Sequence, residues 1–170
     1  MNQELLLVSL TKYYQHAPEQ RIRKIVDIIE GRSSISLRLI DWYVTNYCKT
    51  NNIVLLDAAT SEYFNVYMNY RSQLKAFKKI QFDPFRRRDR IMFPYDEDKV
   101  LHTTIGQLNF FRWAIEHKII DTIERNLSTI ERDMMLVHSE EPVLKQTTVP
   151  PSSSIKSMTT FNGSTLISFE

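Results

Sequence analysis

The scarcity of glycine is the feature that most limits what this chain can fold into. Its 170 residues contain three glycines, Gly31, Gly106 and Gly163. A loop that wraps a phosphate in backbone amides needs several glycines, and neither GxxxxGKS/T nor GxGxxG occurs in the sequence. The sequence therefore argues against a P-loop nucleotidase and against a Rossmann enzyme. Any phosphate that the chain binds must be held by charged side chains.

Cysteine and histidine exclude further classes. The single cysteine, Cys48, rules out an internal disulfide and every Cys-rich zinc motif, and the four histidines lie in separate segments without an HExxH pattern. Cys48 with a distant histidine would form a thiol dyad, but a lone cysteine on an aromatic-rich helix is typically buried. The acidic run 96–98 lacks the spacing of a calcium loop. We therefore expect a non-enzymatic protein with no cofactor, metal or catalytic residue.

The apolar segments are too short to cross a bilayer, because no stretch approaches the 18–20 apolar residues that a spanning helix needs. The run LLLVSL near the start follows Glu4 and precedes Lys12, and it lacks the basic start and small-residue cleavage site of a secretory signal. We expect a reducing, intracellular compartment and no membrane partner.

Hydrophobic periodicity indicates a mainly α protein, a compact bundle of five to six helices with at most a short strand. Thr104-x-x-Gln107 fits a capping box at the start of one helix. The run 53–56 fits either a short strand or an apolar arm, and residues 82–100, with two prolines, read as a connection. The expected helices are 2–15, 18–31, 35–49, 61–80, 105–117 and 119–137.

Composition changes near the end of the chain. From Pro142 onward the sequence is rich in proline, serine and threonine, and it finishes in the β-prone TLISFE. The sequence therefore predicts a helical domain over 1–141 and an extended tail over 142–170.

Charge is distributed unevenly along the chain. The formal net charge is +2, but residues 71–90 carry +6 and residues 91–141 carry −5. The basic block contains the eight cations Arg71, Lys75, Lys78, Lys79, Arg86, Arg87, Arg88 and Arg90.

The basic block is the best candidate for a binding site. Phosphates need cations on one face, and bases stack on aromatic rings placed among them. The first four cations follow i, i+4, i+7 and i+8, so they would line one side of a helix over 61–80. Aromatic residues alternate with the cations: Tyr67, Tyr70, Phe77, Phe82, Phe85 and Phe93. The pattern predicts nucleic-acid binding, to DNA in preference to RNA. Two alternatives remain open: the arginine run pairs with acidic residues of this or a neighbouring chain, or the cations are simply solvated.

Three stretches resemble an uncharacterised protein family of the large nucleocytoplasmic DNA viruses, the relatives of mimivirus, marseillevirus and chlorovirus. They are SLRLIDWYVTNYCKTNN, FNVYMNYRSQLKAFKKIQFDPFRRRDRI and TTIGQLNFFRWAIEHKIIDTI. The resemblance covers roughly residues 34–125 and the terminal SFE, and it transfers no catalytic residue. One departure follows Ile115, where we expect a glycine-like helix stop and the chain has Glu116-His117-Lys118.

The resemblance implies a viral protein located in the host cytoplasm, at the viral factory, or in the virion. It also implies an alternative function, that of a virion structural or assembly protein, either a minor capsid protein or an internal component. Such a protein would contact its own copies or other virion proteins through charged faces and the 142–170 tail.

Overall fold

Helix α6 (Ile105–Glu116) is the centre of the computed structural model, which describes residues 2–146. Nine of its twelve residues are buried. A helix that is covered on all sides must lie in a core rather than on a surface. Thr104 caps it, accepting a hydrogen bond from the backbone amide of Gln107 at 3.1 Å, as the sequence predicts.

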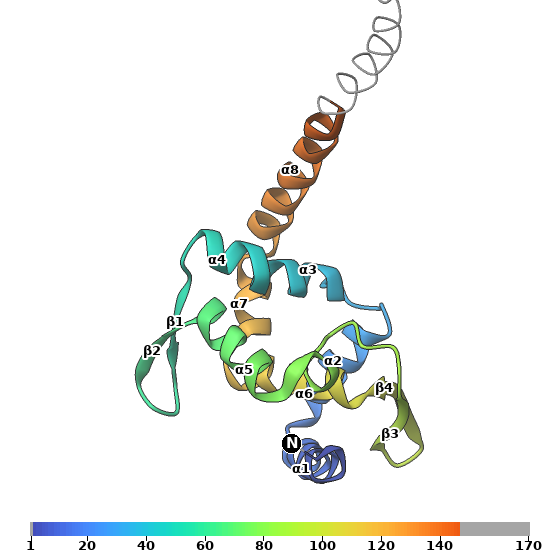
Figure 1. Cartoon of the computed structure of the whole chain (residues 1–170). Helices are drawn as coiled ribbons and strands as arrows, with labels where there is room; N and C mark the ends of the chain where they lie inside the picture. The colour runs from blue at the N-terminus through green and yellow to red at the C-terminus, as the bar shows by residue number, and fades with distance from the viewer. Residues whose placement is uncertain (1, 147–170) are drawn as a thin grey trace, which may run out of the picture. The chain divides into compact units, whose positions relative to one another are not determined.

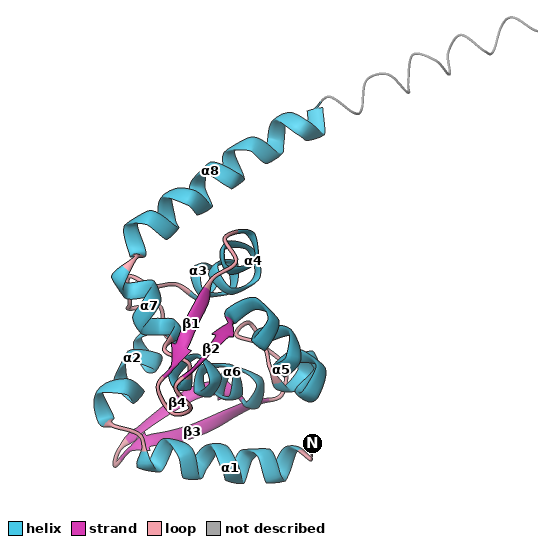
Figure 2. Ribbon diagram, turned by 90° about the vertical axis from the view of Figure 1, so that its left-hand side faces the viewer, coloured by secondary structure: helices cyan, strands magenta, loops and turns pink. Residues whose placement is uncertain are grey.

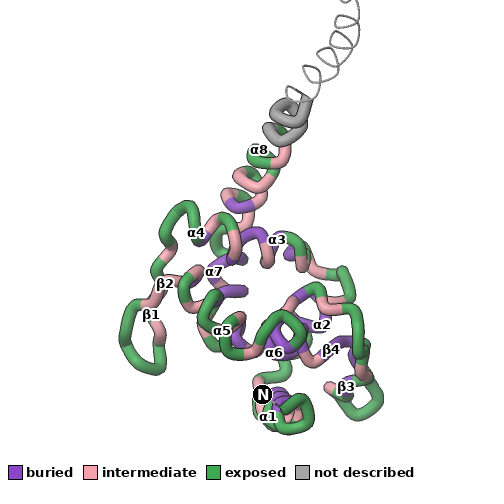
Figure 3. The backbone as a smooth tube through the Cα atoms, viewed as in Figure 1, coloured by how far each residue is buried: buried purple, intermediate pink, exposed green. Residues whose placement is uncertain are grey.

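Three helices pack directly against α6: α1 (Gln3–His16), α5 (Val66–Gln81) and α7 (Ile119–Arg125) (Figure 1). Leu6, Leu10 and Tyr14 form the buried side of α1. The buried hydroxyl of Tyr14 donates a hydrogen bond to the carbonyl oxygen of Leu108 at 2.6 Å, which ties α1 to the central helix. Figure 3 shows buried positions along α6 and α7, and further ones on α2, α3 and β4.

The next helices match the sequence predictions closely. Helix α2 (Glu19–Ile29) begins after Pro18 and is followed by Gly31, whose φ of +79° is a left-handed conformation that suits glycine. The predicted helix 35–49 is a continuous helical segment made of α3 (Leu37–Trp42), a π-helical turn η1 (Tyr43–Tyr47) and α4 (Cys48–Thr50).

The expectation of at most a short strand is wrong, because the described residues contain two antiparallel hairpins (Figure 2). The first pairs β1 (Val54–Asp57) with β2 (Glu62–Asn65), and the second pairs β3 (Arg90–Asp96) with β4 (Lys99–Thr104). The mainly helical class itself is confirmed.

The first hairpin shortens the helix that was expected over 61–80. The side chain of Asn65 accepts a hydrogen bond from the backbone amide of Met68 at 2.9 Å and so caps α5 at residue 66. Residues 62–65 pair instead with β1, which identifies the run 53–56 as part of a strand rather than an apolar arm.

The second hairpin lies in the segment that was expected to be a connection. Its signal is an alternation in β3, where Ile91, Phe93 and Tyr95 are covered and the residues between them are exposed. Pro94 argues against a strand in this part of the sequence. Proline is nevertheless tolerated on an edge strand, and a two-stranded ribbon consists only of edge strands.

The chain divides into two compact units, residues 1–130 and 131–170. The expected helix 119–137 is broken at Asn126 into α7 and α8 (Leu127–Gln146). Helix α8 covers the first five residues of the predicted 142–170 tail, and the rest of that tail, with Gly163, lies outside the described residues. Within 2–146, no helix is both long enough and apolar enough to pass through a bilayer.

Candidate nucleic-acid interface

The loop over residues 82–89 carries the arginine run and is fastened to the start of α6. The backbone amide of Asp83 donates to the Gly106 carbonyl at 3.2 Å, and the side-chain amide of Gln107 donates to the Pro84 carbonyl at 2.8 Å. The Thr104 hydroxyl donates to the Arg86 carbonyl at 3.3 Å. The backbone that presents the arginines is therefore held in one conformation before any ligand binds.

Gly106 allows this close approach. A Cβ at this position would lie 3.1 Å from the carbonyl oxygen of Ile80 and 3.3 Å from the Cβ of Arg86. Ile80 lies near the end of α5 and Arg86 lies in the arginine loop, so both atoms belong to the segment 80–86. The glycine is therefore used to bring that segment against α6, and its role is close packing rather than phosphate binding.

The three consecutive arginines have different surroundings. The Arg86 side chain is 21% exposed and pairs with Asp89 at 2.8 Å, so its charge is balanced within the loop. Arg87 and Arg88 are exposed, and neither side chain has a hydrogen bond or ion pair with any residue in the described part of the chain. Arg90 begins β3 and donates a hydrogen bond to the His102 carbonyl at 3.2 Å. Arg87 and Arg88 are therefore the arginines best placed to bind a ligand.

The four cations of α5 do not share one helical face. Lys78 has φ 62° and ψ 165°, so regular helix stops before it and the i+7 and i+8 relations fail. That region of backbone space is almost restricted to glycine. The break directs the chain toward α6, where the Gln81 carbonyl accepts a hydrogen bond from Asn109 at 2.9 Å. Only Arg71 and Lys75 keep the predicted i, i+4 relation.

Lys79 faces carboxylates of this chain. Burial raises the pKa of Asp41, the neighbouring charge of Asp83 raises it further, and the charge of Lys79 lowers it. The positive charge of Lys79 is therefore partly balanced by Asp41, which makes Lys79 a weaker candidate for phosphate than Arg71 or Lys75.

Lys49 adds a cation that the sequence analysis missed. Its ammonium group lies 5.5 Å from the ring centroid of Tyr67, and Arg71 lies over the same ring while donating to the Tyr67 hydroxyl at 3.2 Å. The hydrogen bond from Arg71, helped by the charge of Lys49, lowers the pKa of Tyr67. Arg71 and Lys75 also border a shallow hollow on α5 with Met68. Lys49 and Tyr67 meet through folding alone, and no local sequence pattern indicates their contact.

Most of the alternating aromatic residues belong to the core. Tyr70, Phe82 and Phe93 are 8%, 1% and 6% exposed, and the ring of Phe82 lies 5.7 Å from that of Trp113. Phe77 is half-buried and stacks on Phe82. Two of the six remain able to contact a base: Tyr67, which is half-buried, and Phe85, which is 38% exposed.

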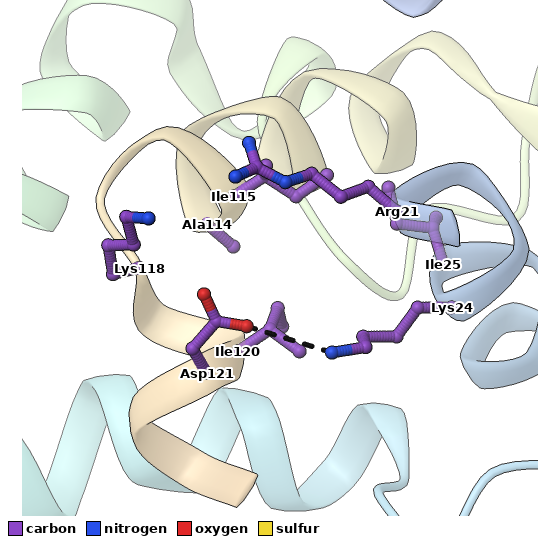
Figure 4. A pocket seen from close by; sticks show the side chains of 8 residues that line it. All are labelled: Arg21, Lys24, Ile25, Ala114, Ile115, Lys118, Ile120 and Asp121. Carbon is purple, nitrogen blue, oxygen red and sulfur yellow. Dashed lines mark ion pairs between the residues drawn. The ribbon is translucent and has the colours of Figure 1, made fainter. Parts of the chain in front are cut away.

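Two acidic residues of the 91–141 segment form ion pairs with helix α2. Lys24 of α2 lies 3.6 Å from Asp121 and 2.9 Å from Glu124, beside a cavity of about 20 Å³ that holds roughly one water (Figure 4). Among the described side chains, which end at residue 139, no ion pair joins the eight cations of the basic block to an acidic residue of the 91–141 segment. The alternative in which the arginine run pairs with the acidic segment of its own chain therefore receives no support there.

The remaining chemical candidates are inert in this structure. Cys48 is buried, as predicted, and burial raises the pKa of its thiol to about 12, against a lowering effect of Tyr43. A thiol with such a pKa is not a nucleophile at neutral pH. The described residues hold no group of three metal-type side chains.

Comparison with known proteins gives two matches. Residues 2–160 match the family of unknown function DUF7197. Over 139 residues, the chain is 36% identical to an uncharacterized protein of Acanthamoeba polyphaga mimivirus, an alignment covering 77% of this chain and 53% of the mimivirus protein. The chain thus spans about half the length of that curated relative. No solved structure matches the chain. The predicted resemblance to a giant-virus family is confirmed.

Proposed function

We propose that this chain, which belongs to the DUF7197 family of unknown function, binds nucleic acid through the exposed cations of its basic block and catalyses no reaction. The preferred partner is DNA rather than RNA. The main phosphate contacts are Arg87 and Arg88, supported by Arg71, Lys75 and Arg90. The protein would act in the host cytoplasm, at the viral factory, or in the virion.

One observation carries the proposal: two adjacent arginines stand without a protein partner in the described chain on a loop that three hydrogen bonds fasten to the core. An isolated surface arginine is usually mobile, and ordering it costs side-chain entropy. Here the backbone is already ordered, so binding a phosphate fixes only the side chains. Guanidinium groups also bind phosphate in a bidentate manner, which makes arginine well suited to this role.

The proposal is tested with the double variant Arg87→Ala/Arg88→Ala and a 20-base-pair DNA labelled for fluorescence anisotropy. Each phosphate contact contributes about −0.9 to the slope of log K against log salt, so losing two should make the slope shallower by ~1.8. Affinity at about 50 mM salt should fall by roughly tenfold. The matched control is Arg23→Ala/Arg132→Ala, which removes the same charge from two exposed arginines that pair with Glu19 and Asp133.

Two results would contradict this function. One is the absence of any DNA binding by the unaltered protein at about 50 mM salt, where electrostatic binding is strong. The other is an equal loss of affinity in the Arg23→Ala/Arg132→Ala control, which would show that only net charge matters.

A second candidate, a role in virion assembly, is favoured by an apolar surface on the first hairpin. Val54, Leu56 and Tyr63 are 47%, 52% and 75% exposed. Leu56 pairs with Tyr63, and Val54 lies two residues along the strand, so all three occupy the same side of the ribbon. Exposed apolar clusters mark protein contacts. The variant Leu56→Lys should then leave the fold intact and reduce self-association in sedimentation; unchanged association would remove this candidate.

A further inference from the structure

The basic loop forms one wall of a groove that is large enough for a nucleotide. The groove has a volume of about 470 Å³, within the usual range of small-ligand sites. Arg87 and Arg90 come from the arginine loop and the start of β3, while Val100 and His102 come from β4. The end of α2, the residue after it and the start of α3 also line the groove, with Ile29, Glu30 and Leu37.

The groove has an apolar surface that phosphate binding alone does not explain. Phe85 and Val100 remain 38% and 41% exposed within it. The backbone of Phe85 is held in a tight turn, because its amide donates a hydrogen bond to the Asp83 carboxylate at 2.9 Å. An exposed aromatic ring that is held in place beside cations can stack an unpaired base.

A carboxylate also faces this groove. Glu30 pairs with Arg32 at 2.8 Å through one of its oxygens, and a carboxylate with two oxygens accepts several hydrogen bonds. Negative charge repels a phosphate but accepts hydrogen bonds from the amino group of a base, as in recognition of cytosine N4. The groove therefore combines cations that can bind the phosphate backbone with a carboxylate, from a different segment, that can accept a hydrogen bond from a base.

From this arrangement we propose that the groove binds one unpaired nucleotide of a single-stranded nucleic acid, with the base stacked on Phe85 and its amino group directed to Glu30. The inference rests on the proposed function and adds to the phosphate contacts, which duplex and single strand share, a base contact that only a single strand can make. The bases of a duplex are stacked inside the helix and present no free face to Phe85. Among the pyrimidines, cytosine carries an amino group and thymine does not, so oligo-dC should bind more tightly than oligo-dT.

The test compares dC12, dT12 and a 12-base-pair duplex as anisotropy probes for the full chain. Stacking on one aromatic ring is worth about 1–3 kcal/mol, so Phe85→Leu should weaken dC12 roughly tenfold and leave the duplex unchanged. Phe85→Tyr retains a stacking ring and should bind dC12 like the unaltered protein, which controls for loss of structure in the loop. Glu30→Gln should reduce the ratio of dC12 to dT12 affinity, because a neutral amide is a weaker acceptor than a carboxylate.

The outcomes separate this inference from the function on which it rests. Equal binding of single strands and duplex, with no effect of Phe85→Leu but a loss with Arg87→Ala/Arg88→Ala, would overturn the groove and preserve nucleic-acid binding. Absence of binding to all three probes would overturn both. A selective loss of dC12 binding in Phe85→Leu, restored in Phe85→Tyr, would establish the stacking site.

Discussion

The side-chain amide of Gln107 donates a hydrogen bond to the carbonyl oxygen of Pro84, 2.8 Å away and 23 positions earlier in the chain. The other end of the same amide accepts a hydrogen bond from the buried hydroxyl of Thr103 at 2.9 Å. Gln107 is itself buried. In a capping box this side chain would turn back to the amide of the capping residue, but here it holds the arginine loop against α6.

Replacing Gln107 should therefore loosen the loop. In Gln107→Ala, the Pro84 carbonyl and the Thr103 hydroxyl lose their partner while buried, which costs about 1–3 kcal/mol in the free energy of unfolding. Urea unfolding measures this loss, and faster hydrogen exchange of residues 83–89 would locate it. Gln15, an exposed glutamine of α1, gives the control Gln15→Ala, which should change the free energy of unfolding by less than about 0.5 kcal/mol. Equal stability of the two variants would contradict this role for Gln107.

The turn between α6 and α7 allows a stabilising substitution. Lys118 has φ 60° and ψ 24°, the left-handed conformation in which glycine normally ends a helix. A residue with a Cβ pays roughly 1–2 kcal/mol there, so Lys118→Gly should raise the free energy of unfolding by about 1 kcal/mol. Lys118→Ala also removes the lysine side chain but keeps the backbone strain, so it should leave the free energy of unfolding unchanged. A Lys118→Gly protein no more stable than Lys118→Ala would contradict the left-handed turn.

Helix α6 could be predicted because its signals are local. Thr104 and Gln107 mark its start, and the apolar residues that follow fill every side of the helix. The end of α6 carries no such local signal, since no glycine follows Ile115. The structure resolves this departure from the expected helix stop: Lys118 takes the left-handed conformation itself, so the division at 118 holds without a glycine.

Features that depend on contacts between distant segments could not be predicted. Tyr63 and Phe64 fit a helical spacing, but their backbone pairs with β1, and that pairing decides the structure. No glycine or proline marks the break at Lys78 in the sequence. The break arises from the attachment of residues 80–81 to α6, which is a contact between distant segments. In the candidate site, the arginines could be found by charge, whereas the approach of Glu30 to Phe85 exists only in the folded chain.

The Tyr67 hydroxyl should report on the basic surface of α5. Arg71 donates a hydrogen bond to it and stabilises its ionised form, so the pKa of Tyr67 lies below the ordinary value. In Arg71→Met, the hydrogen bond is lost and the pKa of Tyr67 should rise, with Lys49 still lowering it to a smaller extent. NMR titration of the tyrosine ring carbons resolves Tyr67 from the other tyrosines. An unchanged pKa in Arg71→Met would show that Arg71 does not contact the hydroxyl in solution.

Cys48 should make stability depend on pH in the alkaline range. Burial raises the pKa of its thiol from 9.0 in the unfolded chain to about 12, so the native state favours the protonated form. The resulting stability is complete below pH 9 and is lost as pH rises from 9 toward 12, at up to about 1.4 kcal/mol per pH unit.

Urea unfolding at pH 7, 9 and 10 measures this loss, and the Cys48→Ala variant isolates it. Tyr43 and Tyr70 also have raised pKa values and contribute in the same direction above pH 10, the ordinary pKa of tyrosine. The contribution of Tyr70 is common to both proteins, whereas Cys48 is one cause of the raised pKa of Tyr43, so the interval from pH 9 to pH 10 isolates the thiol. The difference in stability between the unaltered protein and Cys48→Ala should therefore be constant up to pH 9 and shrink above it. Rapid alkylation of the native thiol by iodoacetamide at pH 8 would contradict the burial on which this prediction depends, because only an exposed thiolate reacts quickly.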